Sequence, residues 1–477
     1  MPRFRCVACA HVAESQRLAP SCVRCGSAVV LSDPPPGSLS RRQFEDLPPG
    51  VWRYGALLAG GGPDDAVSLG EGGTPLLKAE RLGAELGVGG LMIKDESRNP
   101  TGSFLDRGST VLLTLAKRRG VKECVCLTTG NLGASLAAYC AKAGIDARIR
   151  VHPSTDRGKL YQMLAYGADI QPSTRPLQGE SSGVLPVTAG NPYLLEGEKT
   201  TGFEIVQDLG WAAPDVIVVP VGTGGHLSTI WRSIALLREA GLVERSECRL
   251  LGVQVKGAQP GPRGTKKPTA RRPGAPLLTD LEESLPYFAA EAAKAVEESG
   301  GTTVSITPAQ TIESTRLLAA TEGIFAEPSS ASVVSAVRDA VQRGIVGASE
   351  RVVCVVTGAG LKDTTAVSRL ARETRRVAAG EGYALPSPKI GDTKLALLRL
   401  LREGPSYGYE MWQEIGSRRE ISTASIYQHL LELEGFSMVR KKGATISKGR
   451  ERVVYELTRR GADFLTITGK LRASESR

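Results

Sequence analysis

The sequence predicts an α/β protein with parallel sheets, preceded by a small cysteine-rich unit and followed by a basic helical unit. From about residue 69 to residue 378, short apolar runs alternate with helical patterns, which is typical of parallel sheets covered by helices. Four cysteines cluster near the N-terminus, and residues 389–477 hold 17 basic against 11 acidic side chains. At 477 residues the chain exceeds one compact core, so we expect several domains.

The composition is that of a globular protein in a reducing compartment. With 41% hydrophobic residues and 55 glycines, it argues against a disordered chain or a fibre. No apolar run reaches the roughly 18 residues that a membrane span needs, and residues 1–12 lack the apolar centre of a signal peptide. The nine cysteines are odd in number and mostly scattered, which disfavours a disulfide framework. We therefore expect a cytoplasmic protein that does not enter a membrane.

The clustered cysteines form two Cys-x-x-Cys pairs, Cys6 with Cys9 and Cys22 with Cys25, separated by twelve residues. Such pairs lie on tight knuckles whose four thiolates complete a tetrahedral zinc site. A chance spacing is the alternative, but little else in this part of the chain could form a core. Four thiolates leave no open position for a substrate, so the predicted zinc ribbon holds a structural Zn²⁺.

Three strand and helix pairs carry the prediction of parallel sheets in the middle of the chain. The strands are expected at 123–128, 215–220 and 351–356, followed by helices at 132–143, 227–240 and 361–376. Two stretches interrupt the alternation: Gln178 to Pro186 is expected to be a loop, and Lys256 to Pro276 a basic excursion without an apolar face. For this basic excursion, a solvated loop and a nucleic-acid contact are both open.

A glycine-rich loop, Gly222 to Gly225, follows the predicted strand at 215–220 and opens a helix. Bare backbone N–H groups at a helix N-terminus can hold a phosphate. A simple turn between strand and helix would use the same residues. By itself the loop therefore indicates a phosphate site but leaves a purely structural role open.

The order of six motifs is more specific than any one of them. They read Gly70-Glu-Gly-Gly-Thr-Pro-Leu76, Lys94-Asp-Glu-Ser-Arg-Asn-Pro-Thr-Gly-Ser-Phe104, Thr128-Thr-Gly-Asn-Leu-Gly-Ala-Ser135, Pro220-Val-Gly-Thr-Gly-Gly225, Gly323-Ile-Phe-Ala-Glu-Pro-Ser-Ser330 and Thr357-Gly-Ala-Gly-Leu-Lys362. In this order they resemble the threonine synthases, over roughly residues 67–375. The resemblance implies a two-domain, fold type II core of the tryptophan synthase β type, with pyridoxal phosphate between two interleaved α/β subdomains.

The resemblance also implies which residues would hold the cofactor. The phosphate would be held by Gly222, Thr223, Gly224 and Gly225. Asn131 would bond the 3′-hydroxyl of the cofactor, and Thr357 would meet the pyridine nitrogen, where a hydroxyl suits the β- and γ-replacement chemistry of this family. Structural roles are the alternatives, because Asn131 could cap the helix that follows it and Thr357 could merely end a strand.

Position 105 departs from the family pattern. In threonine synthases Ser-Phe is followed by the lysine that forms the Schiff base with the cofactor and moves protons on the substrate, whereas this chain has Leu105 there. Lys94 belongs to the preceding motif and Lys117 lies about three helical turns further on, so neither is an obvious substitute. We expect severely impaired threonine formation and pyridoxal phosphate held without a covalent link. A sequencing error or an engineered inactive form is the other explanation of Leu105.

The C-terminal unit is predicted to contain three helices and a basic hairpin. Helical patterns cover 394–402, 407–415 and 422–434, with Ser422 or Thr423 as the last cap, and two basic runs flank a turn before the strand 453–457. This arrangement resembles the PadR type of winged helix, whose third helix enters the major groove. The predicted domains are a zinc ribbon at 1–33, a linker at 34–66, the threonine synthase-like core at 67–380 and the winged helix at 389–470.

The resemblance to PadR proteins implies double-stranded DNA as a partner. The side chains of the third helix that could contact the edges of DNA bases are Thr423, Ser425, Gln428 and His429. Candidates for phosphate contacts in the wing are Arg440, Lys441, Lys442, Lys448 and Arg450. A protein-contact role is the alternative, since fold alone does not fix function. Helix-turn-helix proteins bind paired half-sites as dimers, so we expect a homodimer on a palindromic DNA sequence.

Three hypotheses follow for the whole chain. In the leading one, a ligand-sensing transcription regulator binds pyridoxal phosphate and an amino acid or a phosphorylated homoserine-like ligand, and closure of the core repositions the winged helices. The second is an active threonine synthase or related lyase that converts O-phosphohomoserine to threonine and phosphate, with an appended DNA-binding domain. The third is a zinc-stabilised scaffold that binds neither cofactor nor DNA.

Overall fold

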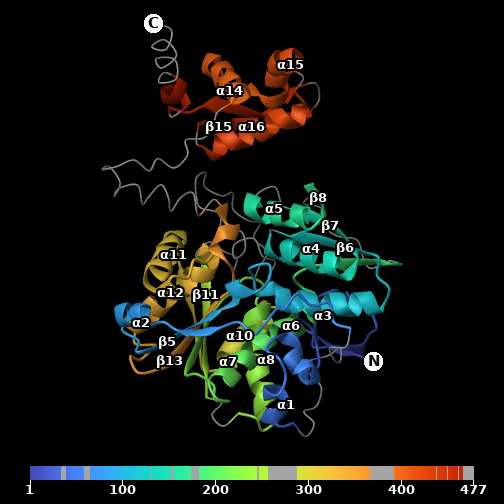
Figure 1. The fold of residues 1–477 in the computed structure, drawn as a ribbon, viewed down its shortest axis with the longest axis vertical. Helices are drawn as coiled ribbons and strands as arrows, with labels where there is room; N and C mark the ends of the chain where they lie inside the picture. The colour runs from blue at the N-terminus through green and yellow to red at the C-terminus, as the bar shows by residue number, and fades with distance from the viewer. Residues whose placement is uncertain are drawn as a thin grey trace. The chain divides into compact units, whose positions relative to one another are not determined.

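The structure of the chain is a computed structural model, drawn as a ribbon in Figure 1. It describes residues 1–33, 39–58, 65–128, 130–151, 155–172, 182–243, 247–255, 287–364, 366, 391–419, 421–436, 438–447, 450–459 and 461–465. The chain forms two compact units, 1–375 and 376–477. Within the described ranges, no helix combines the length and apolar character needed to cross a membrane.

The first unit contains three sheets and their covering helices. Its strands are β1 Arg3–Cys6, β2 Val12–Glu14, β3 Val29–Leu31, β4 Leu76–Lys78, β5 Gly90–Asp95, β6 Glu123–Thr128, β7 Asp146–Val151, β8 Asp169–Pro172, β9 Val184–Val187, β10 Val216–Pro220, β11 Arg249–Val255, β12 Thr302–Ile306 and β13 Arg351–Val356. Its helices are α1 Arg41–Glu45, α2 Glu80–Leu86, α3 Leu105–Arg118, α4 Asn131–Ala143, α5 Arg157–Ala165, α6 Pro192–Glu198, α7 Thr200–Asp208, α8 Gly225–Glu239, α10 Ala289–Glu298, α11 Pro308–Glu322 and α12 Pro328–Gln342, with 3₁₀ turns η1 Val51–Leu57, η2 Glu96–Arg98 and η3 Gly360–Lys362.

Two of the sheets form the predicted parallel core. One has the order β12-β11-β10-β13-β5-β4, in which only the edge strand β4 runs antiparallel to its neighbour. The other has the order β8-β7-β6-β9 and is parallel throughout. The cysteine-rich segment forms a separate antiparallel sheet, β2-β1-β3. The predicted α/β architecture is therefore confirmed.

Strand β10 shows why the strands of this core are continuous runs of apolar residues. Ile217 and Val219 belong to the apolar cluster that includes residues of α8, whereas Val216 and Val218 belong to the cluster that includes residues of α12. Successive side chains of a strand point to opposite faces, so β10 is covered on both sides. A strand buried on both faces reads as an unbroken apolar run, as parallel strands do.

The predicted elements match the structure closely, with one error. Strands β6 and β13 have the predicted bounds, and β10, α4 and α8 begin and end within two residues of them. The predicted loop Gln178 to Pro186 is wrong at its end, because strand β9 starts at Val184. Pro186 is tolerated there since β9 is an edge strand. Most of the helix predicted at 361–376, and the basic excursion at 256–276, lie outside the described residues.

The second unit has the predicted three helices and hairpin. Its elements are α14 Asp392–Glu403, β14 Ser406–Tyr407, α15 Gly408–Arg419, α16 Thr423–Gly435, β15 Val439–Ser447 and β16 Arg450–Leu457. The strands form a sheet of order β14-β16-β15, and the helices share one apolar cluster with it, including Leu398, Ile426 and Tyr455. Three helices on a small antiparallel sheet make a winged helix-turn-helix.

Candidate functional site

The residues predicted to hold a cofactor follow the carboxyl ends of three parallel strands. Asn131 comes after β6, the loop 222–225 after β10, and Thr357 directly after β13. Ligands of open α/β sheets bind outside the carboxyl ends of the strands. The site therefore has the position that the topology favours.

Asn131 and Thr357 are both held by the start of helix α12. Asn131 is the first residue of α4, whose cap is Gly130, and its Nδ2 donates to Glu327 Oε2 at 2.7 Å. The hydroxyls of Ser330 and Thr357 lie 2.8 Å apart. The amide of Asn131 therefore does not cap its helix but faces a carboxylate. Glu327 and Ser330 belong to the motif Gly323 to Ser330, but the sequence alone predicted no role for either residue.

The glycine loop is shaped for a bound anion. Gly224 has a left-handed backbone with φ +88°, and a Cβ there would lie 2.6 Å from the carbonyl oxygen of Phe288. A Cβ on Gly225 would lie 2.6 Å from Leu195 Cδ2. Side chains are excluded at both positions by the packing of Phe288 and Leu195. The N–H of Gly225 donates to the Thr223 hydroxyl at 3.3 Å, and the loop opens the 15-residue helix α8, whose N-terminus is suited to an anion.

Phe104, the neighbour of position 105, contacts both Thr357 and His226, the residue that follows the glycine loop. The N–H of Phe104 donates to the carbonyl of Thr357 at 3.1 Å, and the Phe104 ring stacks on His226, with centroids 4.1 Å apart. Leu105 begins helix α3 next to these contacts and is half-buried. The structure therefore brings position 105, Thr357 and the glycine loop together.

His226 adds no charge beside the glycine loop. Its Nε2 lies 3.1 Å from the Thr201 hydroxyl, and the residue is buried. Burial lowers the pKa of His226 to about 3, because the imidazolium would lose its hydration. The imidazole is therefore neutral at physiological pH and neither attracts nor repels a phosphate.

Of the two lysines considered from the sequence, Lys94 is bound to other groups and Lys117 is exposed at the far end of α3. Lys94 is completely buried, and its Nζ contacts the Thr74 carbonyl at 2.6 Å and carboxylates of Glu204 and Asp208 at 2.9 Å. Lys117 is exposed on the last turn of α3. The residue that sequence reasoning missed is Lys159 on α5, whose Nζ lies 3.0 Å from Glu327 Oε1.

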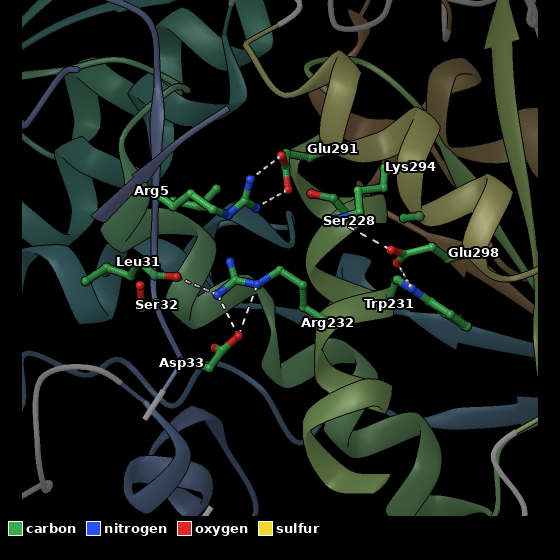
Figure 2. A pocket seen from close by; sticks show the side chains of 12 residues that line it. Arg5, Leu31, Ser32, Asp33, Ser228, Trp231, Arg232, Glu291, Lys294 and Glu298 are labelled. Carbon is green, nitrogen blue, oxygen red and sulfur yellow. Dashed lines mark hydrogen bonds and ion pairs between the residues drawn. The ribbon is translucent and has the colours of Figure 1, made fainter. Parts of the chain in front are cut away.

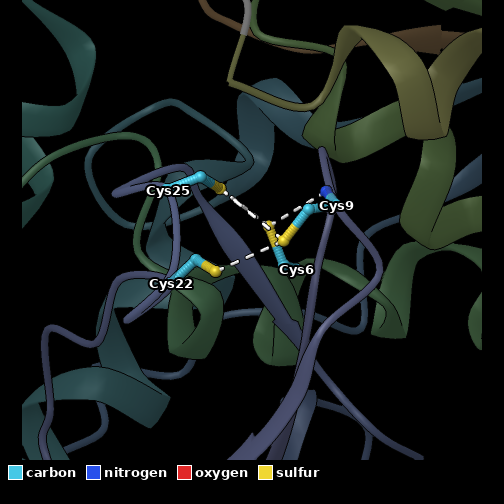
Figure 3. Close-up of side chains that lie close together, drawn as sticks. All are labelled: Cys6, Cys9, Cys22 and Cys25. Carbon is cyan, nitrogen blue, oxygen red and sulfur yellow. Dashed lines mark hydrogen bonds between the residues drawn. The ribbon is translucent and has the colours of Figure 1, made fainter.

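The four N-terminal cysteines converge as predicted (Figure 3). Their sulfur atoms all lie within 4.8 Å of one another. The sulfur of Cys6 is 3.6 Å from that of Cys25, and Cys9 is 3.6 Å from Cys22. Zinc bonded tetrahedrally to four sulfurs at about 2.3 Å requires sulfur separations of about 3.8 Å. The cluster therefore fits a structural zinc ion.

A cavity of about 270 Å³ lies between the cysteine-rich sheet and helices α8 and α10 (Figure 2). Arg5, beside Cys6, bonds Glu291 of α10 at 2.7 Å. Arg232 of α8 bonds Asp33 at 2.8 Å. These pairs fasten the cysteine-rich sheet to the two helices that flank the glycine loop, so the cavity is bounded by an ion-paired domain contact.

The candidate DNA-contacting residues of α16 differ in exposure. Of the two predicted caps, Ser422 and Thr423, the structure shows Ser422, whose hydroxyl accepts from the N–H of Ser425 at 3.2 Å. Gln428 is exposed, whereas Thr423, Ser425 and His429 are half-buried. The hydroxyl of Ser425 and Nε2 of His429 lie 3.5 Å apart. Of the four candidates, Gln428 therefore has the most accessible side chain.

The described basic residues of the wing lie on the two strands of the predicted hairpin, β15 and β16. Arg440, Lys441 and Lys442 are exposed residues of β15. Arg440 contacts Glu456 at 2.6 Å, and Lys441 contacts Glu434 at 3.2 Å. Exposed pairs of this kind are weak, so the cations remain able to exchange to phosphates. Arg450 begins β16, and Lys448 lies outside the described residues.

Two families match separate parts of the chain. Residues 67–358 match the pyridoxal-phosphate dependent enzyme family, and residues 397–467 match the transcriptional regulator PadR-like family. Among curated proteins, the chain is 34% identical to threonine synthase of Methanocaldococcus jannaschii over 391 residues, which cover 78% of this chain and 96% of that protein. It is 38% identical to threonine synthase of Synechocystis over 312 residues, which cover 62% and 78%.

The fold also has counterparts among solved structures. It is similar to the processed form of threonine deaminase isoform 2 from Solanum lycopersicum, with a TM-score of 0.50 and 19% identity. The similarity covers 74% of this chain and 98% of that one. At this level of identity the likeness concerns the fold alone.

Proposed function

The chain belongs to the threonine synthase family of pyridoxal-phosphate dependent enzymes, and from this premise we propose that it is a DNA-binding transcription regulator. In this proposal the family's cofactor site binds a ligand and does not efficiently make threonine. The observation that carries the proposal is Leu105, an apolar side chain at the position where the threonine synthase pattern has a lysine. A fold inherited from an enzyme does not by itself supply the activity.

The residues present fit pyridoxal phosphate. The loop of Gly224 and Gly225 has no room for side chains and lies at a helix N-terminus, which suits the phosphate. Asn131 would bond the ring hydroxyl and Thr357 the ring nitrogen, while Gly222 and Thr223 would complete the phosphate loop. When bound, the cofactor would supply an electron-withdrawing ring for amino-acid chemistry.

Leu105 removes the group that the reaction needs at the start of α3. Leucine has no amine, so the cofactor forms no covalent bond to residue 105. General acid–base catalysis is worth about 10² to 10⁴ in rate, so threonine formation should be severely impaired. The ligand of the regulator is then an amino acid or a phosphorylated homoserine-like molecule, bound with the cofactor.

In this proposal the winged helix binds the DNA. Helix α16 would present Gln428 and its neighbours to base edges, while Arg440, Lys441 and Lys442 would contact phosphates. Arg450 and Lys448 complete the set of wing cations in the proposal. The protein would act as a homodimer on a palindromic site in the cytoplasm. Regulation requires that the ligand bind the DNA-competent and DNA-incompetent states with different affinities.

The zinc ribbon would support the cofactor site rather than take part in chemistry. The proposal includes the predicted domains: the zinc ribbon at 1–33, the linker at 34–66, the threonine synthase-like core at 67–380 and the winged helix at 389–470. We expect one zinc ion per chain, lost in Cys9→Ser. Metal analysis of the purified protein checks this expectation, and a zinc-free wild-type protein that keeps its fold would contradict it.

The proposal is tested by selecting DNA from a random duplex library with the full chain, with and without pyridoxal phosphate and L-threonine. We expect a palindromic sequence whose affinity changes at least about fivefold when both small molecules are present. Selection of no sequence would refute the regulator. Turnover of O-phosphohomoserine to threonine at the rate of an ordinary synthase would instead favour the active enzyme.

Leu105→Lys is the matched control. It restores an amine at the start of α3, and borohydride should then trap pyridoxal phosphate at residue 105. Threonine formation should rise by about 10² to 10⁴ relative to the natural chain. A variant that binds the cofactor but gains neither property would show that the site has lost more than its lysine.

A further inference from the structure

We propose that Lys159 supplies the amino group that position 105 lacks, and that its nitrogen forms a C=N bond with the aldehyde carbon of pyridoxal phosphate. An amino acid with a primary amine would then displace Lys159. This inference rests on the proposed cofactor site, and it goes beyond it by naming the covalent partner and the class of ligand.

Lys159 lies in the site without belonging to any of the six motifs. It is near the start of α5, and its side chain is 3% exposed. Its aliphatic stem passes over Gly130, where an added Cβ would lie 2.2 Å from Lys159 Cδ. Gly130 has φ +152°, so the chain accommodates the lysine only because this residue has no side chain.

The amine of Lys159 is two polar contacts from the residue assigned to the ring hydroxyl. Its Nζ lies 3.0 Å from Oε1 of Glu327. The other carboxylate oxygen, Oε2, accepts from Asn131 Nδ2 at 2.7 Å. The hydroxyl that Asn131 would bond is next to the aldehyde carbon on the pyridine ring. A cofactor held by Asn131 therefore brings its reactive carbon to the side of the site where Lys159 lies.

The other buried lysines of the described chain are placed differently. Lys94 contacts Glu204 and Asp208, away from Asn131. Lys199 contacts Asp33 at 2.7 Å, at the cysteine-rich sheet. Lys362 is buried beside Gly102, where an added Cβ would lie 3.3 Å from its Cδ. Lys362 also acts electrostatically on Asp106, next to position 105. Lys159 is therefore distinguished by its link through Glu327 to Asn131, and Lys362 is the rival lysine that the labelling must exclude.

The chemistry balances with the groups present. The ammonium of Lys159 transfers a proton to the carboxylate of Glu327, and the neutral amine attacks the aldehyde carbon. A C=N bond forms, the C=O bond breaks, and the oxygen leaves as water after taking up protons, one of them from Glu327. No oxidant or reductant is needed. An amino acid then displaces Lys159, because its amine forms a C=N bond to the same carbon and the amine of Lys159 is released.

The test is to incubate the full chain with pyridoxal phosphate, reduce it with borohydride, and locate the phosphopyridoxyl group by peptide mass spectrometry. We expect the group on Lys159. L-Threonine added before reduction should lower this labelling at least about fivefold by exchange, with phosphopyridoxyl-threonine released as the product.

Two variants make the outcome specific. Lys159→Arg keeps a cation against Glu327 but does not form a stable C=N bond, so labelling should fall at least about tenfold while equilibrium dialysis still detects bound cofactor. Lys362→Arg should label like the natural chain. Retained cofactor without label on Lys159, or label on another lysine, overturns this inference and leaves the cofactor site standing. Absence of bound cofactor overturns both.

Discussion

Leu105 and Arg107 lie two residues apart at the start of helix α3, yet they belong to very different surroundings. Arg107 is completely buried and bonds the carboxylates of Glu96 at 2.6 Å and Glu204 at 2.7 Å. Leu105 is half-buried and packs against the apolar core. The comparison teaches that two positions in one helical turn can differ completely in role, because Arg107 joins a buried network of charges whereas Leu105 makes apolar contacts.

In the buried cluster around Arg107, positive and negative side chains lie against one another. Arg107 and Lys94 face Glu96 and Glu204, two cations against two carboxylates, and all four are buried. Burial alone would raise the pKa of Glu204, but the charges of Arg107 and Lys94 outweigh it and hold this pKa below its ordinary value. The carboxylates are therefore ionised in the folded protein, and removing one partner leaves the others uncompensated.

Glu198 provides the contrast within the same core. It ends helix α6 and is as deeply buried as Glu204, which lies on the next helix. Burial raises the pKa of Glu198 to about 8, and no charge of the described residues offsets this rise. The same residue type is thus ionised in one place and largely protonated in the other, because only one has cations beside it.

The largest effect that tests the comparison is expected from Arg107→Met. Methionine fills part of the volume but leaves Glu96 and Glu204 buried without their cation, so the free energy of unfolding at pH 7 should fall by about 3–5 kcal/mol. Urea unfolding measures it. The control is Arg98→Met, since Arg98 is 65% exposed in its pair with Asp95 and should matter by less than about 1 kcal/mol. Equal effects would break the comparison.

The next effect is a pH-dependent one from Glu198→Gln. In the natural chain the folded pKa of Glu198 is about 8, against an ordinary 4.5. As pH rises between these values the unfolded state loses its proton first, so this group makes the fold progressively less stable. Glutamine removes that loss and should raise the free energy of unfolding at pH 8 by about 2–4 kcal/mol. Unfolding curves at pH 5 and pH 8 should differ less in the variant, and an unchanged pH dependence would contradict the assignment.

A smaller effect is expected at the site itself from Thr357→Val. The change removes the hydroxyl that contacts Ser330 and would meet the ring nitrogen, which costs about 1 kcal/mol in cofactor binding. Equilibrium dialysis with pyridoxal phosphate should therefore give an affinity about fivefold lower. Thr303→Val, at an exposed position of β12, is the control. A loss of stability as large as that of Arg107→Met would mean that Thr357 serves the scaffold.

The smallest effect on stability is expected from Lys442→Gln in the wing. Lys442 is exposed and lies 3.6 Å from Glu456, so the free energy of unfolding should change by less than about 0.5 kcal/mol. DNA affinity should nevertheless fall, with a salt dependence about 0.9 shallower on logarithmic scales. Titrations at several salt concentrations measure it. An unchanged salt slope would remove Lys442 from the set of phosphate contacts.

Local patterns in the sequence were sufficient for much of the fold. Strands β6 and β13 were predicted with the bounds that the structure has, because buried parallel strands are continuous apolar runs bordered by turn residues. The cap of the third C-terminal helix was narrowed to Ser422 or Thr423 from their place before an apolar helix, and the structure shows Ser422. Strand β9 was missed because its short run, Val184–Val187, contains a proline, which is tolerated only at a sheet edge that the sequence does not reveal.

The sequence by itself determined the family resemblance, the four clustered cysteines, and the leucine at position 105, since each depends on residue identity and spacing. The tertiary structure alone decided which lysine lies beside Glu327, which carboxylates are compensated, and which helices hold the cysteine-rich sheet. The carboxylate of Glu327 joins Asn131 to Lys159 across separate helices. Such contacts connect segments far apart in the chain, and the charge state of each group depends on burial and on neighbours that only folding supplies.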